Sequence, residues 1–300
     1  MPAALATPLI FNPSSPNSVR RSAAVFNIND LDSSGLRRIL LLTFMLIKIL
    51  LAILLTLSLA AMRIDTKRRR MQPLVAMRAL RTLISDPVRT EQVFIIIRAM
   101  SGNALENCYK QFRGTPVGKQ VLTEQRQLIE LLQDRQALGA LPPGSLGRHY
   151  LSFVEKEEIS AQELVDASDD VIEITDPGLS LYARRIRDMH DLWHVTTGYG
   201  RDTFGEACLL AFTYAQTRNR GIGTIALVGY FKLRKEIGSG VAAAMWQGYR
   251  AGRKAEWLPA QDWENLLSLP IDEVRECLNI GEPVKYHQKH AQLALTRALA

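Results

Sequence analysis

Cysteines, aromatic residues and phosphate-binding glycine loops are scarce or missing in this sequence. Aromatic residues make up only 7% of the chain, and its three cysteines, Cys108, Cys208 and Cys277, stand far apart with no CxxC pair. This excludes a disulfide framework and a cysteine-based zinc finger, and it fits a reducing compartment. No glycine-rich loop with a following lysine occurs, so nucleotide chemistry has no support.

The sequence has an excess of positive charge, and the position of that charge along the chain indicates the kind of partner. The 300 residues carry a net charge of +7 at pH 7, which suggests either nucleic acid or an anionic membrane surface as a partner. Much of that excess lies at Arg63 and residues 67–70, directly after an apolar run. We therefore expect membrane lipid as a partner and no nucleic acid.

Two segments precede the main domain. Residues 1–38 show no helical or strand period and are predicted to be a disordered tail, with an organelle-targeting peptide as the alternative. Residues 39–62 are predicted to be a transmembrane or membrane-anchoring helix, because 39–61 include 15 Leu, Ile or Phe residues and only one charge, Lys48. A helix buried in the protein and a true start at Met62 or Met71 remain alternatives.

The rest of the chain, residues 63–300, is predicted to form one all-α domain. No strand run alternates convincingly. Apolar residues recur at helical spacing in 74–84, 91–100, 121–132, 179–195, 204–214, 222–237 and 241–249. Turn residues predict breaks at 86–87, 114–118, 141–147, 176–178, 198–200, 221–223, 238–240 and 270.

A histidine and carboxylate pattern carries the chemistry. On a helix, His190 and His194 lie one turn apart on the same face, and Asp191 lies three residues before His194. A glycine-bounded turn at 198–200 lets a second helix run back and bring Glu206 opposite the histidines. Two imidazoles and two carboxylates suit Zn²⁺, Fe²⁺ or Mn²⁺.

Each of these residues has an alternative role. The histidines could belong to an ordinary core and bond to Asp188 or Asp191. Glu206 could close a capping box with Thr203 as the helix cap. Aspartate after the first histidine, where zinc proteases need glutamate, makes peptide hydrolysis improbable.

Other polar groups give weaker signals. Arg253, in a basic run that closes an apolar helix, is a candidate anion site for a substrate head group or else a charged helix end. His287 and His290 could form a second site but resemble a solvated face. The His-Asp pair also resembles HD-type phosphohydrolases, for which His149 and Asp262 are only loose further ligands.

The motif resembles that of the coenzyme Q biosynthesis protein 4 family, which works in ubiquinone synthesis. His190, Asp191 and His194, followed after eleven residues by Glu206, match that family's metal motif with its full spacing. The resemblance covers residues 75–283 and includes 114–118, 143–150, 205–217, 252–255, 263–264 and 274–280. Residues 1–62 have no counterpart in the family core.

The resemblance implies an all-helical fold with an apolar tunnel for an isoprenoid tail. It implies oxidative decarboxylation at carbon 1 of a prenylated 4-hydroxybenzoate ring, with the four motif residues as ligands of a divalent metal, Zn²⁺ first and Fe²⁺ or Mn²⁺ next. The implied partners are quinone intermediates and other ubiquinone-synthesis enzymes; a homodimer stays open. The implied location is the inner membrane, on its cytoplasmic or mitochondrial matrix side.

Two hypotheses follow for the function. The first is a metal-dependent decarboxylase of the prenylated ring, with His190, Asp191, His194 and Glu206 at its centre. The second is a non-catalytic lipid-binding scaffold, in which the ion fixes two helices and the tunnel presents intermediates to other enzymes. A phosphohydrolase is the third and weakest alternative.

Overall fold

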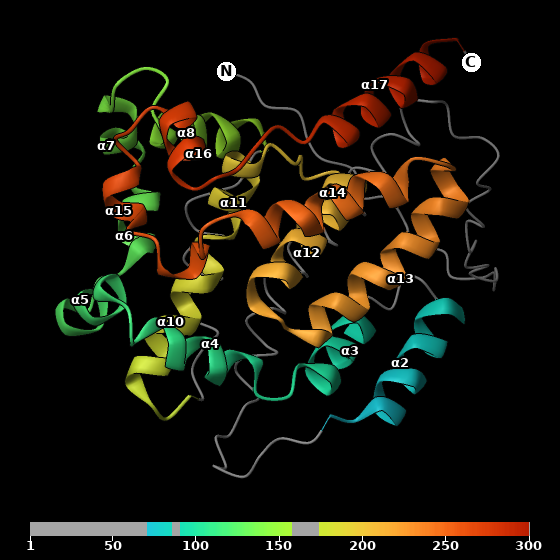
Figure 1. Cartoon of the computed structure of the whole chain (residues 1–300), viewed down its shortest axis with the longest axis horizontal. Helices are drawn as coiled ribbons and strands as arrows, with labels where there is room; N and C mark the ends of the chain where they lie inside the picture. The colour runs from blue at the N-terminus through green and yellow to red at the C-terminus, as the bar shows by residue number, and fades with distance from the viewer. Residues whose placement is uncertain (1–70, 86–90, 158–173, 300) are drawn as a thin grey trace, which may run out of the picture. The chain divides into compact units, whose positions relative to one another are not determined.

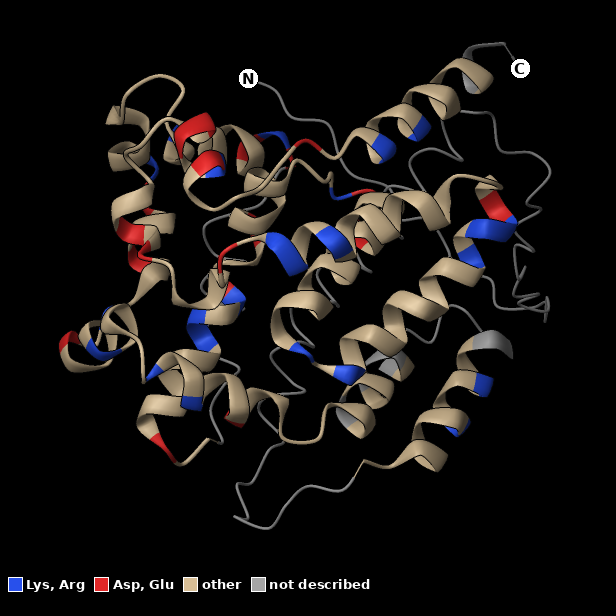
Figure 2. Cartoon of the chain, viewed as in Figure 1, with Lys and Arg blue, Asp and Glu red and all other residues tan. Residues whose placement is uncertain are grey.

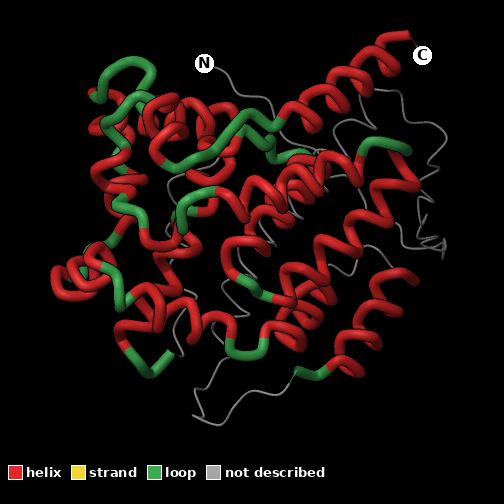
Figure 3. Tube along the Cα trace, viewed as in Figure 1, coloured by secondary structure: helices red, strands yellow, loops and turns green. Residues whose placement is uncertain are grey.

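The computed structural model describes residues 71–85, 91–157 and 174–299. All of these residues belong to the second of two compact units, Met45–Ala300. Helices and loops make up this described part, without a strand, which confirms the predicted all-α class (Figures 1 and 3). The tail and the apolar run at 39–62 lie outside the described residues, so the division at residues 38 and 62 stays a prediction.

The helices are labelled in chain order. They are α2 (Pro73–Ser85), α3 (Glu91–Ser101), α4 (Ala104–Phe112), α5 (Pro116–Glu124), α6 (Leu128–Gln133), α7 (Arg135–Ala140), α8 (Leu146–Lys156), α10 (Pro177–Asp188), α11 (His190–Thr197), α12 (Thr203–Thr217), α13 (Arg220–Ile237), α14 (Val241–Lys254), α15 (Trp263–Leu266), α16 (Ile271–Cys277) and α17 (Val284–Leu299), with a 3-10 turn η2 at Leu258–Ala260. Within these ranges, no helix has the length and apolar character needed to cross a bilayer.

Helix α12 is the centre of the packing. It lies along α14 and also contacts α13, α11 and α17 (Figure 1). Glycines on α14 allow the close approach, because a Cβ atom at Gly248 would lie 2.7 Å from the Cys208 carbonyl oxygen and one at Gly252 would lie 2.5 Å from that of Phe212. Cys208 and Phe212 are both fully buried in the main core. The helix that carries Glu206 is therefore held along its length.

Two smaller cores extend the main one. Ala76, Ile96 and Ile225 are buried where α2 and α3 pack on α13. Phe112 of α4 packs on Tyr182 of α10, with ring centroids 4.8 Å apart. These contacts fix the helix that leads into the histidine motif.

Two predicted helices are each divided in the structure. The run at 121–132 separates into α5 and α6, because Gln125 adopts a left-handed conformation with φ 53°. The run at 179–195 separates into α10 and α11 at Met189. Apolar periodicity continues through both breaks and therefore does not reveal them.

The predicted break at residues 221–223 is wrong. Both glycines lie inside α13. The break falls earlier: Arg218 ends α12 in a left-handed conformation with φ 55°, and Asn219 is the N-cap of α13. The glycines serve packing, since a Cβ at Gly221 would overlap the Ile97 carbonyl oxygen on α3 and one at Gly223 would press on the Tyr214 ring. Glycine in this helix marks close contact between elements.

Replacing Gly221 with alanine is therefore expected to destabilise the protein by about 2 kcal/mol, because the added methyl group overlaps backbone on α3. Gly229, also inside α13, is the matched control: its nearest neighbour would be the Ala207 Cβ, 4.0 Å away. Gly229→Ala should leave stability unchanged or raise it by up to about 1 kcal/mol through helix propensity. Urea unfolding measures both variants; equal effects would contradict the packing role of Gly221.

Candidate metal centre

The two helices that bear the site are set by local capping. Asp176 caps α10 by accepting from the Leu179 N–H at 3.0 Å, with Pro177 at the first helical position. Helix α11 follows after Met189 and ends at Gly198, whose φ of 76° suits glycine. The motif therefore lies on a short helix closed by a left-handed cap.

The turn between α11 and α12 is held on several sides. Asp202 caps α12 by accepting from the Phe204 and Gly205 N–H groups. The Tyr286 hydroxyl donates to Asp202 Oδ2 at 2.5 Å and accepts from the Gly200 N–H at 3.2 Å. A side chain at Gly205 would overlap the Gly200 carbonyl, so glycine lets the turn fold back on the helix.

The structure brings all four predicted ligands together. Single ligand atoms of His190, Asp191 and His194 lie within 4.8 Å of one another. Glu206 completes the group from α12, with its Oε1 3.3 Å from His194 Nε2. His190 Nδ1 lies 3.4 Å from Asp191 Oδ1, and the two imidazole centroids are 4.9 Å apart. The three motif residues on α11 therefore group together, and Glu206 contacts that group through His194.

The capping-box alternative for Glu206 is wrong. Asp202 is the N-cap of α12, so Thr203 is the first helical residue and Glu206 lies one position past the place that a capping box requires. The Glu206 carboxylate points to His194 and has no role as a cap. Its orientation leaves it available as a ligand.

The site is sheltered and negatively charged. The side chain of His194 is fully buried, those of Glu206 and Asp191 are 15% and 17% exposed, and that of His190 is 32% exposed. Burial raises the pKa of Asp191, but its bond to His190 and the Arg201 cation outweigh this and lower that pKa to about 2. The pKa of Glu206 also falls, since His194 outweighs burial. Both carboxylates are therefore ionised near neutral pH.

Unpaired atoms between the helices show that the residues fit a metal. His194 Nδ1 lies 3.0 Å from the Tyr199 carbonyl oxygen; this acceptor assigns the proton to Nδ1 and leaves a lone pair on Nε2. That lone pair faces the Glu206 carboxylate, and neither Nε2 nor Oε2 has a hydrogen-bond partner in the structure. A neutral His194 Nε2 and Glu206 Oε1, 3.3 Å apart, repel unless a proton or a metal ion lies between them, and the lowered pKa of Glu206 corresponds to the state with a proton there. Metal-bound histidines commonly donate their other N–H to a carbonyl in this way.

Metal affinity should rise with pH. Burial lowers the pKa of His190, but Asp191 and Glu206 outweigh it and raise the pKa above its ordinary value of 6.5. A proton therefore competes with the ion at His190 below that pKa, and the affinity for Zn²⁺ should fall about tenfold per pH unit there. A competition titration with a chromophoric chelator from about pH 5.5 to about pH 8 measures this. A flat profile, or one that His190→Asn does not change, would contradict the role of His190 as a ligand.

The other candidates lie elsewhere. Arg253 follows Gly252, whose carbonyl accepts from Gln216 at 2.7 Å, and its guanidinium bonds the Tyr249 hydroxyl. Gln216 lies in the last turn of α12, whereas Glu206 lies in its first turn. The contact between Gln216 and Gly252 therefore places the neighbouring Arg253 at the end of α12 that is far from Glu206. His287 and His290 are about half exposed and lie 3.8 Å and 3.9 Å from Glu282 and Asp202.

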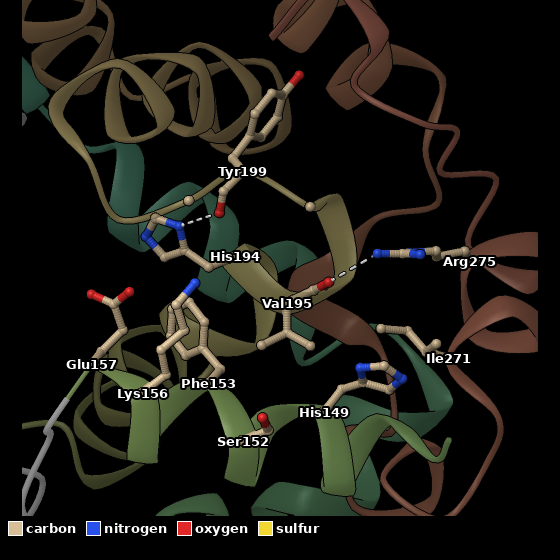
Figure 4. Close-up of a pocket in the computed structure, with 12 residues that line it drawn as sticks. His149, Ser152, Phe153, Lys156, Glu157, His194, Val195, Tyr199, Ile271 and Arg275 are labelled. Atoms are coloured by element: carbon tan, nitrogen blue, oxygen red, sulfur yellow. Dashed lines mark hydrogen bonds between the residues drawn. The ribbon is translucent and has the colours of Figure 1, made fainter. Parts of the chain in front are cut away.

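A cavity of about 280 Å³ opens on the other side of His194. Figure 4 shows Phe153 and Lys156 of α8 below the His194 ring, with Arg275 across the cavity. Phe153 stacks on His194 at a centroid distance of 5.7 Å, and His149 also lines the cavity. Arg275 is occupied by the Thr196 and Val195 carbonyls at the end of α11. His194 therefore separates the ligand cluster from a cavity of about the size of one substituted ring.

The sequence reading missed two polar groups beside the cluster. The Arg201 guanidinium helps to lower the pKa of Asp191 and of Glu206, although the bond to His190 is the larger cause for Asp191 and His194 is the larger cause for Glu206. The Tyr150 hydroxyl is buried on α8 without a hydrogen-bond partner, and Asp191 contributes to its raised pKa. Only the position of Arg201 between two predicted ligand helices could have signalled its role.

Fold and site together define a helical protein with a mixed histidine and carboxylate cluster that is formed by two consecutive helices, α11 and α12. A model of the family described as coenzyme Q (ubiquinone) biosynthesis protein Coq4 matches residues 61–284. The chain belongs to this family, as its motif predicted.

Curated relatives and a solved structure agree with this family. The chain is 30% identical over 199 residues to the Aedes aegypti ubiquinone biosynthesis protein COQ4 homolog, mitochondrial, covering 65% of this chain and 70% of that protein. It is 27% identical over 220 residues to the Mus musculus homolog, covering 72% and 80%. A crystal structure of a candidate ubiquinone biosynthesis protein from Nostoc punctiforme matches with a TM-score of 0.52 and 20% identity, over 70% of this chain and 98% of that chain. This last likeness concerns the fold alone.

Proposed function

We propose that this member of a ubiquinone-biosynthesis family is a metal-dependent enzyme that removes the carbon 1 carboxylate of a prenylated 4-hydroxybenzoate ring and leaves a hydroxyl in its place. The observation that carries the proposal is that His194 Nε2 lies 3.3 Å from Glu206 Oε1, while Nε2 and the other carboxylate oxygen, Oε2, are buried without a hydrogen-bond partner. Together with His190 and Asp191 they supply two nitrogen and two carboxylate ligands. This donor set suits Zn²⁺ first, with Fe²⁺ and Mn²⁺ as alternatives.

The reaction has a fixed balance of atoms and electrons. Written with water as the formal source of oxygen, the aryl carboxylate gives the phenol, carbon dioxide, one proton and two electrons, so a two-electron oxidant such as dioxygen accepts those electrons. When bound, a divalent ion supplies Lewis-acid stabilisation for negative charge that develops near the ring. His194, held by the Tyr199 carbonyl, keeps its lone pair on Nε2, and the ionised Asp191 and Glu206 hold two negative charges at the site.

The cavity beside His194 supports binding of the ring. Its volume of about 280 Å³ accommodates a substituted benzene ring but no long isoprenoid chain. Phe153 and the His194 ring offer an aromatic wall, and Lys156 offers a cation (Figure 4). We assign the isoprenoid tail to a separate apolar tunnel among the alanine- and leucine-rich helices, as the family resemblance implies.

The outer surface supports attachment to a membrane. Leu227 and Phe231, one turn apart on α13, are 56% and 63% exposed, and Trp246 on α14 is 61% exposed. Basic residues gather in the last turns of these helices and along α2 (Figure 2). Relatives are named mitochondrial, which supports a mitochondrial location. The family resemblance further implies the matrix side of the inner membrane, beside other enzymes of the same synthesis.

A non-catalytic scaffold is the second candidate. It is favoured by one observation: the ligands come from two helices, so a bound ion would fix α11 against α12 without any reaction. Under this alternative, removal of the metal would dissociate the complexes with partner enzymes. The purified protein would convert no ring substrate.

A profile of intermediates in cells tests the proposal. Cells that lack the protein receive wild type, His190→Ala or an empty vector, and prenylated rings are measured by mass spectrometry. We expect both the variant and the empty vector to accumulate a ring that retains its carboxylate. Restoration of ubiquinone by His190→Ala, at an equal protein level, would overturn the proposal and favour the scaffold.

A further inference from the structure

Tyr286, on the C-terminal helix α17, contacts the turn that joins the two ligand-bearing helices. It is 5% exposed, and its ring packs on those of Tyr199 and Phe204 at centroid distances of 5.5 Å and 5.3 Å. Tyr199 lies in the turn, and Phe204 lies in the first turn of α12. A side chain 86 residues farther along the chain than Gly200 therefore packs on both ends of this turn.

The start of α17 is itself held by α14. The Gln247 side chain accepts a hydrogen bond from the Lys285 N–H at 2.8 Å and donates one to the Glu282 carbonyl at 3.2 Å. Tyr286 follows directly after Lys285. Its ring is therefore anchored from a helix that carries none of the proposed ligands.

The Tyr286 hydroxyl holds the peptide group that orients His194. The carbonyl oxygen of Tyr199 accepts from His194 Nδ1 at 3.0 Å, and the N–H of Gly200 donates to the Tyr286 hydroxyl at 3.2 Å. That carbonyl and that N–H belong to one planar peptide group and point in opposite directions from it. Rotation of the peptide group would break both hydrogen bonds. The hydroxyl therefore fixes the carbonyl to which His194 donates.

The same hydroxyl donates to a carboxylate that caps the second ligand-bearing helix. Asp202 Oδ2 accepts from the Tyr286 hydroxyl at 2.5 Å. Asp202 Oδ1 accepts from the Phe204 and Gly205 N–H groups at 3.1 Å and 3.2 Å, and Glu206 is the next residue. One hydroxyl is therefore bonded to the peptide group behind His194 and to the cap that precedes Glu206.

These bonds form a continuous chain from Asp202 to His194. Hydrogen bonds in such a chain polarise one another. Donation to a carboxylate makes the Tyr286 oxygen a stronger acceptor for the Gly200 N–H, and the polarised peptide group makes the Tyr199 carbonyl a stronger acceptor for His194. The chain therefore strengthens the hold on the proton at His194 Nδ1 and raises the electron density at Nε2.

We propose that Tyr286, supported by Asp202, is a positioning residue that favours the proton on His194 Nδ1 and so makes Nε2 a stronger metal ligand. This inference rests on the proposed function in one respect, that a metal binds at Nε2. Groups that orient a metal-bound histidine through its other nitrogen raise its basicity and its affinity for the ion. Tyr286 lies beyond residues 61–284, which the family model matches.

The zinc affinity of Tyr286→Phe tests this role. The variant keeps the ring and loses only the hydroxyl. Competition with a chromophoric chelator, on the full-length protein, should show an affinity for Zn²⁺ about 10- to 100-fold below that of wild type, with unchanged helix content by circular dichroism. Tyr182→Phe is the matched control, because it also removes a buried hydroxyl, on α10, that has no hydrogen-bond partner. Its zinc affinity should equal that of wild type.

A double variant tests whether the two residues act through one chain. Asp202→Asn keeps a side chain that caps a helix but removes the carboxylate, so it should also weaken zinc binding. The protein with both Tyr286→Phe and Asp202→Asn should bind zinc no more weakly than Tyr286→Phe alone. Losses that add would show that the residues act separately and would overturn the inference.

The tautomer of His194 gives a readout without any metal. In the metal-free protein, the Tyr199 carbonyl and the Glu206 carboxylate compete for a proton on this ring. Nitrogen-15 spectra at about pH 8.5, above the ordinary histidine pKa, report which nitrogen carries that proton, and His194→Gln assigns the signal. Wild type should carry more of the proton on Nδ1, and Tyr286→Phe should shift it toward Nε2.

The outcomes separate this inference from the proposed function. Equal zinc affinity in wild type and Tyr286→Phe would overturn the inference and leave the proposed function standing. A loss of affinity without a change of tautomer would show that Tyr286 acts only through the fold and would also overturn it. If wild type binds no zinc, the proposed function fails. A tautomer that still shifts in Tyr286→Phe would then support the positioning of His194, and an unchanged tautomer would contradict it.

Discussion

Replacing His194 with glutamine is expected to abolish metal binding and ubiquinone formation while leaving the protein folded. His194 is the fully buried member of the four proposed ligands, and it faces both Glu206 and the other imidazole. Loss of a group that supports a ligand costs about 10- to 100-fold in metal affinity, so loss of the ligand itself should cost on the order of 100-fold or more. Elemental analysis of the purified variant, with circular dichroism, measures metal content and helix content together.

His287→Gln is the matched control for that variant. His287 is about half exposed and lies 3.8 Å from Glu282, far along the chain from the motif. The His287→Gln protein should retain the metal content and activity of wild type. A His194→Gln protein that keeps one metal per chain would contradict the assignment of this residue as a ligand.

Replacing Arg185 with methionine should give the largest loss of stability, about 3 to 5 kcal/mol. Arg185 on α10 is 1% exposed, and it donates to both carboxylate oxygens of Glu264 at 2.6 Å and 2.7 Å and to the Gln261 carbonyl. Removing one partner leaves the Glu264 carboxylate, only 12% exposed, without its counter-ion. Urea unfolding of wild type and variant measures the loss.

Two further variants identify the cause of that loss. Arg184→Met, at the half-buried neighbour that bonds Ser180, should change stability by less than about 1 kcal/mol. The double variant Arg185→Met and Glu264→Leu should recover much of the stability, because no buried charge is then left unpaired. An Arg185→Met protein as stable as wild type would show that the ion pair does not anchor α10 to α15.

The cluster of candidate ligands could be predicted from the sequence because its geometry is local. His190, Asp191 and His194 fall on one helix, where spacing alone decides which side chains converge. Glu206 needed only a tight turn at residues 198–200 and a second helix running back. The structure contains the turn, which begins at Gly198, and the second helix, α12.

Groups that depend on tertiary packing could not be predicted in the same way. Arg253 was a candidate for the head group because it ends an apolar helix. Its position depends on the packing of α14 along α12, which places Gly252 beside Phe212 and Gln216. The buried, unpaired Nε of Arg201 is likewise visible only once its neighbours are placed.

The glycines show the same limit for the fold. Gly198 and Gly238 end helices with φ of 76° and 77°, as the turn prediction expected. Gly221 and Gly223 lie inside a helix and serve contacts with Ile97 and Tyr214. A residue without a side chain suits both a turn and a close approach, and only the neighbouring helix distinguishes them.

Turnover by the purified protein tests the central claim most directly. The metal-loaded full-length protein is incubated with an oxidant and prenylated 4-hydroxybenzoate that carries ¹³C in its carboxylate, and labelled carbon dioxide is measured alongside the ring product. The decarboxylase account predicts one labelled carbon dioxide for each new ring hydroxyl, and none with His194→Gln or after removal of the metal. A protein with its full metal content that releases no label, or a His194→Gln protein that releases as much as wild type, would contradict it.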